Sequence, residues 1–466
     1  MPIQRILAML KLGALAAVIA VSVLWPRPEH VAANPLSGVA GVATGLSHTC
    51  ALTTAGGVKC WGANFSGQLG NGTASGFDPN PTPVDVVGLS SGVAAIAAGN
   101  GHTCALTTAG GLKCWGGNKF GQLGNGTFSG NPNPTPVDVV GLSSGVAAVA
   151  AGADHTCALT TAGGLKCWGR NQYGQLGDGT DGGGNQSTSP VDVVGLSSGV
   201  AAVATSGWHT CAVTTAGGLK CWGHNRFGQL GDGTTAFSQP IPVDVSGLTS
   251  GVAAAAGGSH RTCALTTANG VKCWGFNAVG SLGDGTTTDR TTPVDVVGLA
   301  SGVAAIASRC ALTDAGGVKC WGGNFYGQLG DGTTSGSDPN PIPVDVVGLS
   351  SGATAIAAGN SHTCAVTTAG GLKCWGHNTS GELGDGTTTN RTNPVAVVVL
   401  GPKATPTPFD FNGTPVAVGG FQTTLEGDSA SGNNAGALAA TVIAVLAAAI
   451  ALVFAAWYAK RWLVKR

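Results

Sequence analysis

The sequence predicts an all-β fold, a seven-bladed β-propeller of four-stranded blades, plus one C-terminal transmembrane helix. A similar unit recurs seven times between residues 38 and 400, and each copy contains one Cys-Trp pair. Successive tryptophans of these pairs are 54, 53, 54, 52, 47 and 54 residues apart, the size of a four-stranded propeller blade. Residues 435–459 carry no charge and are numerous enough to span a bilayer as a helix.

The N-terminal segment predicts a secretory signal peptide at residues 1–33. Arg5 and Lys11 precede an uncharged stretch over residues 12–25, and Val31-Ala32-Ala33 is a small-residue cleavage site. The apolar stretch is short for a bilayer span, which makes a retained signal anchor the weaker alternative.

Residues 34–400 are expected to form the propeller. A typical copy has an apolar run over residues 146–151, two runs around Cys157 and Cys167 that flank a Thr-Thr-Ala-Gly-Gly turn, and a last run at residues 190–194. The alanines of the first run fit the crowded centre of a propeller. A β-helix has repeats of about nine residues, so the period excludes it. The blades are expected at about 38–88, 92–142, 145–196, 199–248, 251–299, 302–349 and 352–400.

The 14 cysteines form seven pairs, and the two members of each pair are ten positions apart. In a hairpin centred on the Ala-Gly-Gly turn the two members stand opposite each other, close enough for a disulfide. Zinc sites favour tighter spacing and need four ligands, so we expect disulfides formed in an oxidising compartment, with no metal and no cofactor. The expected bonds are Cys50–Cys60, Cys104–Cys114, Cys157–Cys167, Cys211–Cys221, Cys263–Cys273, Cys310–Cys320 and Cys364–Cys374.

Charges also recur at fixed positions. The third predicted strand of blades one to six carries a lysine and the fourth an aspartate, as in Lys166 and Asp192, whereas blade seven has Lys373 and Ala396. We predict six cross-strand ion pairs.

Histidines near the first cysteine of a blade are expected to hydrogen-bond the turn between the first two strands, and the Gly-Asp-Gly-Thr stretches to form turns. Isolated carboxylates cannot form the pairs that hydrolases need, and no nucleophile–His–acid set stands out from the repeat. These residues are His48, His102, His155, His209, His260 and His362, with Asp178, Asp232, Asp284, Asp331 and Asp385. Blade six lacks the His-Thr pair, and its turn must be shorter.

After the propeller, residues 401–434 predict a stalk rich in Pro, Thr, Gly and Ser. The apolar segment 435–459 ends in Trp457 and Tyr458, and residues 460–466 form a basic tail. Interfacial aromatic residues and a cytoplasmic basic tail predict a single-pass protein of the cell membrane, with the propeller outside and the C-terminus in the cytoplasm.

The motifs Ser-x-His-Thr-Cys-Ala-Leu, Trp-Gly-x-Asn and Gly-Gln-Leu-Gly-Asp-Gly-Thr resemble the regulator of chromosome condensation repeat. This resemblance implies a seven-bladed propeller. The founding member is a nuclear exchange factor for a small GTPase, but this chain has neither its long insertion nor a basic arm. With 22 basic and 22 acidic residues, the chain is not expected to bind nucleic acid.

Function is expected on one face of the propeller. The Thr-Thr-Ala-Gly-Gly turns are nearly the same in every blade, whereas the loops on the opposite face, here called the variable face, differ between blades. Aromatic and Arg side chains are frequent in binding sites. We therefore predict a non-catalytic, monomeric ectodomain that binds a protein or polysaccharide at the cell surface; the alternatives are a passive spacer or envelope-layer component and, third, an enzyme. Arg261 is expected to add bulk to the same face. The candidate binding residues are Lys119, Phe120, Arg170, Tyr173, Trp208, His224, Arg226 and Phe227.

Overall fold

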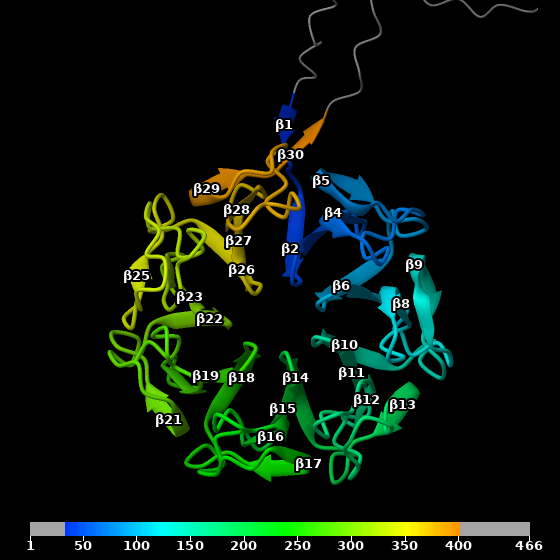
Figure 1. The fold of residues 1–466 in the computed structure, drawn as a ribbon, viewed down its shortest axis with the longest axis vertical. Coiled ribbons are helices and arrows are strands. Elements are labelled where there is room, and N and C mark those ends of the chain that lie inside the picture. Colours follow the sequence, from blue (N-terminus) through cyan, green and yellow to red (C-terminus); the bar gives the residue numbers. More distant parts are fainter. Residues whose placement is uncertain (1–32, 401–466) are drawn as a thin grey trace, which may run out of the picture. The chain divides into compact units, whose positions relative to one another are not determined.

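The computed structural model describes residues 33–400, and the regular elements in this range are β-strands. Seven four-stranded antiparallel sheets lie around a centre, as Figure 1 shows, which confirms the predicted seven-bladed propeller. Within the same range no helix has the length and apolar character needed to cross a membrane. The predicted stalk, membrane helix, basic tail and residues 1–32 of the signal peptide lie outside the described residues.

The four strands of each blade follow one another in the chain. The first strands are β2 (Val39–Thr44), β6 (Val93–Ala98), β10 (Val146–Ala151), β14 (Val200–Thr205), β18 (Val252–Gly257), β22 (Val303–Ala307) and β26 (Ala353–Ala358). The second strands are β3 (His48–Thr53), β7 (His102–Thr107), β11 (His155–Thr160), β15 (His209–Thr214), β19 (Arg261–Thr266), β23 (Cys310–Thr313) and β27 (His362–Thr367). The third strands are β4 (Val58–Asn64), β8 (Leu112–Asn118), β12 (Leu165–Gly169), β16 (Leu219–His224), β20 (Val271–Gly275), β24 (Val318–Cys320) and β28 (Leu372–Gly376). The fourth strands are β5 (Gly76–Asp85), β9 (Ser129–Asp138), β13 (Ser187–Asp192), β17 (Ser238–Asp244), β21 (Arg290–Asp295), β25 (Val344–Asp345) and β29 (Arg391–Ala396).

The first strand of each blade lies nearest the centre (Figure 1). In the third blade β11 and β12 pair so that Cys157 faces Cys167, the register expected from the hairpin. All seven predicted disulfides are present in this arrangement. The sulfur atoms are buried in the core, where each bond joins the two middle strands of its blade.

The predicted cross-strand ion pairs are present in blades one to six. Lys166 faces Asp192 across β12 and β13, with 2.7 Å between Nζ and Oδ1, and the other five pairs are 2.6 or 2.7 Å apart. In blade seven Lys373 faces Ala396, as the sequence indicated. The aspartates are 62 to 76% exposed, so these pairs are surface features.

The hydrophobic core is divided among the contacts between neighbouring blades. Trp168 of the third blade, for example, packs with the Cys104–Cys114 disulfide and Leu123 of the second blade. Gly124, at a φ of +68°, leaves room for this indole, because an added Cβ would lie 2.5 Å from Trp168 Nε1. Each tryptophan of a Cys-Trp pair is fully buried in this way.

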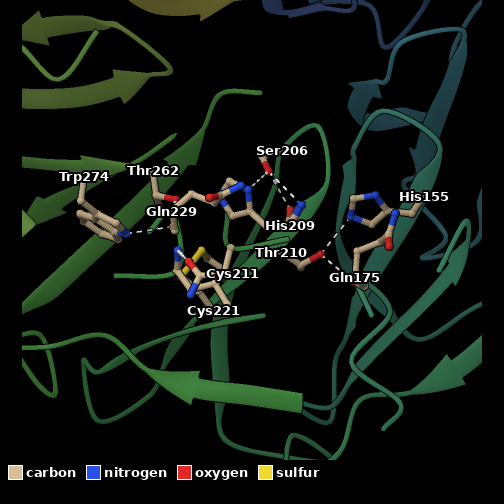
Figure 2. Close-up of a disulfide and its surroundings, with 12 residues drawn as sticks. His155, Gln175, Ser206, His209, Thr210, Cys211, Cys221, Gln229, Thr262 and Trp274 are labelled. Carbon is tan, nitrogen blue, oxygen red and sulfur yellow. Dashed lines mark hydrogen bonds between the residues drawn. A yellow bond between two sulfur atoms is a disulfide. The ribbon is translucent and has the colours of Figure 1, made fainter. Parts of the chain in front are cut away.

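A polar relay of histidine and threonine accompanies five of the seven apolar contacts between blades, and Figure 2 shows part of it. The Gln175 carbonyl of the third blade accepts hydrogen bonds from Thr210 Oγ1 (2.9 Å) and Trp222 Nε1 (3.0 Å) of the fourth. His155 Nε2 lies 2.9 Å from the same Thr210 oxygen. Because Thr210 donates its only proton to the carbonyl, His155 donates to Thr210 through Nε2.

This relay corrects the predicted role of the histidines. They join neighbouring blades, as the bonds from His48 to Thr103 and from His362 to Thr49 show. Of the described repeat histidines only His209 also bonds the turn of its own blade, with Nδ1 2.6 Å from Ser206 Oγ. His260 was wrongly included, because Arg261 occupies the first position of β19 in its blade. Arg261 is 9% exposed, so the prediction that it adds bulk to the variable face is also wrong.

The ring closes between the last and first blades by the same contacts. Thr49 Oγ1 and Trp61 Nε1 both donate to the Glu382 carbonyl, at 2.8 Å each. Outside the blades, β1 (Ala33–Pro35) pairs antiparallel with β30 (Val398–Leu400), and Figure 1 shows these two strands side by side. No blade needs a strand from the opposite end of the chain.

Candidate functional site

Each variable loop is held from inside by repeat residues. In the third blade Asn171 Oδ1 accepts from the Leu176 amide (3.0 Å), and its Nδ2 donates to the Thr180 carbonyl (3.0 Å). Gln175 Oε1 accepts from the Tyr173 amide at 2.9 Å. Because buried side chains fix the loop backbone, the side chains at positions 170 and 173 are free to differ between blades.

One end of the variable-face cluster is cationic. The Arg170 guanidinium lies between two aromatic rings, with its Cζ 4.6 Å from the centre of Phe120 and 4.7 Å from that of Trp208. Lys119 Nζ lies 5.6 Å from the Phe120 centre. These residues come from blades two, three and four, so the contacts cross two blade boundaries. Arg170 is also bound to Asp154, with 3.2 Å between Nη1 and Oδ2.

The aromatic rings continue from Trp208 toward the fifth blade. Trp208 contacts Tyr173 at 5.8 Å between ring centres, and Tyr173 contacts His224 at 4.6 Å. His224 then meets Phe227 at 6.3 Å. Phe227 in turn lies 5.1 Å from both His260 and Phe276, while Phe237 packs on Tyr173 at 5.4 Å. We call this connected set the aromatic stripe: Lys119, Phe120, Arg170, Tyr173, Trp208, His224, Phe227, Phe237, His260 and Phe276.

The charge of the stripe comes from arginine and lysine. Burial, with the charges of His260 and Arg226 adding to it, lowers the pKa of His224 to about 4. Burial and the Arg261 charge also lower the pKa of His260. Both imidazoles are therefore neutral at neutral pH and add no positive charge to this face. Burial raises the pKa of Asp154, against the hydrogen bond and charge of Arg170.

The structure brings all the candidate binding residues except Arg226 into the stripe. Arg226 is exposed beside it and makes no hydrogen bond or ion pair with the described residues. Three stripe residues were missing from the candidates: Phe237, His260 and Phe276. Phe237 is the most exposed of them, at 59%. The signal for Phe276 was its variable-loop position after Trp-Gly, and that for His260 was its one-residue offset from the repeat histidines.

Two hollows adjoin the stripe on the same face. A cavity of about 310 Å³ is lined by Phe65, Asn100, Lys119, Phe120 and Asp154, at the cationic end. A second, of about 230 Å³, is the mouth of the central channel and is lined mainly by glycine, alanine, serine and asparagine of the turns between first and second strands. A ligand on the stripe would therefore meet a hollow at one end and the channel beside it.

The Gly-Asp-Gly-Thr aspartates take part in turns, as predicted. Asp178 Oδ1 accepts from the Thr180 amide at 3.0 Å and from Thr180 Oγ1 at 2.8 Å. Over residues 33–400 no group of three His, Cys, Asp or Glu side chains gathers as a metal site.

Comparison with known proteins identifies the repeat. The RCC1-like domain matches residues 11–310, and the regulator of chromosome condensation (RCC1) repeat matches residues 315–366 and 353–382. The ultraviolet-B receptor UVR8 of Arabidopsis thaliana is 33% identical over 278 residues, which are 58% of this chain and 61% of the receptor. The human E3 ubiquitin-protein ligase HERC2 is 34% identical over 245 residues, 52% of this chain but 5% of the ligase. The chain thus spans less than two thirds of these relatives.

Solved structures share the fold. Prp20p of Saccharomyces cerevisiae aligns with a TM-score of 0.62 at 22% identity, over 73% of this chain and 85% of Prp20p. Human WBSCR16 aligns with a TM-score of 0.53 at 24% identity, over 78% of this chain and 83% of WBSCR16. At these identities the alignments support a common propeller fold.

Proposed function

Because the chain belongs to the regulator of chromosome condensation (RCC1) repeat family, we propose that its propeller is a non-catalytic module that binds a protein or a polysaccharide through the variable face. Relatives offer a precedent for protein binding: the Prp20p structure is described together with its binding to Gsp1p and histones. Whole relatives differ in activity, since one is a light receptor and another a ligase.

The observation that carries this proposal is the aromatic stripe. Its rings and guanidinium come from four neighbouring blades and contact one another without a break. Apart from His224, which is buried and bonds Gln229, the loops' own packing does not require these side chains, because the buried Asn and Gln of each loop already hold the backbone. Tyr, Trp and Arg are the side chains most enriched among residues that dominate binding energy.

The stripe also constrains the partner's charge. At the cationic end Lys119 and Arg170 lie near one carboxylate, Asp154, and Arg226 is exposed beside the stripe, whereas Asp181 bonds Ser238 next to Phe237 at the other side. The positive charge is therefore concentrated at the Lys119 and Arg170 end. A partner with carboxylates next to apolar or sugar-ring surfaces complements this pattern, because carboxylates bind guanidinium groups and flat surfaces stack on aromatic rings.

The test uses the propeller segment 34–400 as bait for cell-surface components, with variants of the stripe and of Arg226 beside it. Alanine at Tyr173, Trp208, Arg226 and Phe227 should abolish binding of any captured partner. Since Tyr173 and Trp208 are half-buried in mutual contact, the separate variants Arg226→Ala and Phe237→Ala are decisive: both side chains are exposed, so they should weaken binding without lowering the unfolding temperature.

The matched controls are Thr161→Ala and Thr215→Ala, exposed residues in the constant turns on the opposite face. Loss of binding in these controls, with full binding by the stripe variants, would place the partner on the wrong face for this proposal. Capture of nothing from either protein or glycan fractions would favour the passive spacer or envelope-layer component.

We also propose that the propeller is displayed outside the cell membrane, held by residues 435–459. The support is the seven disulfides, because such bonds persist in oxidising compartments. Protease added to intact cells should release a propeller fragment by cutting between residues 401 and 434. A fragment that appears only after lysis would contradict this orientation.

A further inference from the structure

The sixth blade interrupts the polar relay between blades. Only Ser308 and Arg309 separate β22 from β23, so this blade has neither the histidine nor the threonine of the repeat. Arg309 stands directly before the first cysteine, where the other blades have threonine, and Arg261 stands where other blades have histidine. Two arginines thus replace neutral relay residues at neighbouring blade contacts.

Both arginines bind neutral groups. Arg261 Nη2 donates to Ser308 Oγ at 2.6 Å, between blades five and six, and Arg309 Nη2 donates to the Asn360 carbonyl, between blades six and seven. Among the described residues, no carboxylate lies within ion-pair distance of either guanidinium. Arg261 Nε is buried and has no hydrogen-bond acceptor among the described residues.

Burying these two guanidinium charges without a counter-charge costs folding free energy. Arg261 is 9% exposed and Arg309 7%, and a buried charge is normally compensated by a counter-charge or a full set of hydrogen bonds. Burial, and after it the Arg309 charge, lowers the pKa of Arg261 to about 9. An anion near both would supply the missing compensation.

The mouth of the central channel lies beside this place: neither arginine lines it, but Ser308 and Asn360, to which they donate, both do. Ser308 lines the mouth together with Gly258, Ser259 and Asn360. The Gly258 backbone lies against the Arg261 guanidinium, since an added Cβ would be 2.6 Å from Arg261 Cζ. Ser259 Oγ and Asn360 Oδ1 are 3.1 Å apart and bridge blades five and seven across the shortened turn.

We propose that Arg261 and Arg309 form an oxyanion site at the channel mouth, which binds a phosphate group. Guanidinium groups bind phosphate oxygens through paired N–H donors, and two of them from adjacent blades can share one tetrahedral anion. The small exposed fraction of both arginines restricts the site to a small anion or to a single phosphate group carried by a larger ligand. The site is separate from the aromatic stripe, so each can be tested without the other.

The repeat itself provides the variants. Arg261→His and Arg309→Thr restore the residues that other blades carry at these positions, and Arg226→Ala removes an exposed cation of the variable face as the matched control. The protein is titrated with inorganic phosphate, phosphoserine, acetate and chloride at constant ionic strength, and binding is followed by calorimetry and by the unfolding temperature.

Phosphate should bind the unaltered chain and raise its unfolding temperature with rising concentration, because a ligand of the native state stabilises it. The double variant should lose this shift, each single variant should bind about tenfold more weakly or worse, and Arg226→Ala should bind as the unaltered chain does. A smaller dissociation constant for phosphoserine than for inorganic phosphate would assign the site to a phosphate group carried by a larger ligand. The reverse order would assign it to the free phosphate ion.

The proposal is overturned if phosphate raises the unfolding temperature of the unaltered chain no more than chloride does. It is also overturned if the double variant keeps the full rise in unfolding temperature. The titration of the unaltered chain decides the first point even if a variant fails to fold. Loss of phosphate binding in Arg226→Ala alone would move the anion to the variable-face cations and also refute the site.

Discussion

Acidification should unfold this propeller through its buried histidines, well above the pH at which carboxylates titrate. His48, His102, His155, His209 and His362 are at most 1% exposed. Burial, the largest cause in each case, lowers the pKa of the first four to about 3 and that of His362 to about 4. A second proton on these rings would have to bind at Nδ1, because Nε2 already carries one. In four of them Nδ1 is buried with no hydrogen-bond partner among the described residues, so the charged form is disfavoured: His48, His102, His155 and His362.

The direction follows from linkage. The unfolded chain binds a proton at each histidine near pH 6.5, whereas the folded chain does not until about pH 3 to 4, so stability is complete above 6.5 and falls as the pH is lowered below it. At about pH 5 each histidine removes roughly 2 kcal/mol from the free energy of unfolding, and the five together roughly 10 kcal/mol. The half-buried His224 and His260 have lowered pKa values too and act in the same direction.

The assay is urea unfolding of the disulfide-intact protein at a series of pH values between about 7.5 and 5, a window above the carboxylate pKa values. His155→Asn is the test variant, because asparagine cannot take up the proton. Its free energy of unfolding should be lower at neutral pH but should fall by roughly 2 kcal/mol less across the window. A free energy that stays constant between these pH values, or a variant with an unchanged slope, would refute this account of the histidines.

Three further outcomes are expected. Asp192→Asn should cost about 0.2–1 kcal/mol of unfolding free energy at low salt and less at high salt, because its ion pair with Lys166 is exposed; an equal cost at both salt concentrations would contradict this. Glu382→Gln should make stability less dependent on pH below about 4.5, measured by the same urea series. Burial by itself raises the Glu382 pKa, but the His377 hydrogen bond, the charges of His362 and His377 and a backbone hydrogen bond together lower it. Thiol titration of the denatured, unreduced protein should find no reactive cysteine in the propeller; two or more per chain would contradict the seven disulfides.

The fold could be predicted because its determinants are local and repeated. The register of the middle hairpin follows from the spacing of Cys157 and Cys167 around a fixed turn, and the same register places Lys166 opposite its aspartate. Side chains alternate along a strand, so once one facing pair is known the others on that hairpin follow. Seven copies of such a hairpin left little choice of architecture.

The role of the histidines could not be read in the same way. The partner of His155 is Thr210, which lies 55 positions along the chain and in the next blade. Such a contact exists only when the blades are arranged in a ring, and no spacing within one copy indicates it. His260 was misplaced for a simpler reason: it is a histidine near the cysteine, but the relay position is Arg261, one residue later.

The stripe was partly predictable for a related reason. Position in a variable loop identifies candidates such as Tyr173 and Phe227, but contact between loops of different blades is a property of the ring. Phe237 was missed because it lies at the far end of its loop, just before β17, whereas the candidates were taken from the start of each loop; Phe128 precedes β9 in the same way.

The relay also explains which positions of the repeat are free to change. The acceptor at each blade contact is a backbone carbonyl, so its side chain can differ: Trp115 donates to the carbonyl of Gln68, Trp321 to that of Ser281 and Trp61 to that of Glu382. The donor must be an indole, which is why the tryptophan is the same in all seven blades while the acceptor position is not. Since constant donors and backbone acceptors hold the ring together, the side chains of the variable face contribute little to closing it. Blades can therefore differ on that face at small cost in stability, and this freedom makes a binding surface possible on a scaffold built of near-identical parts.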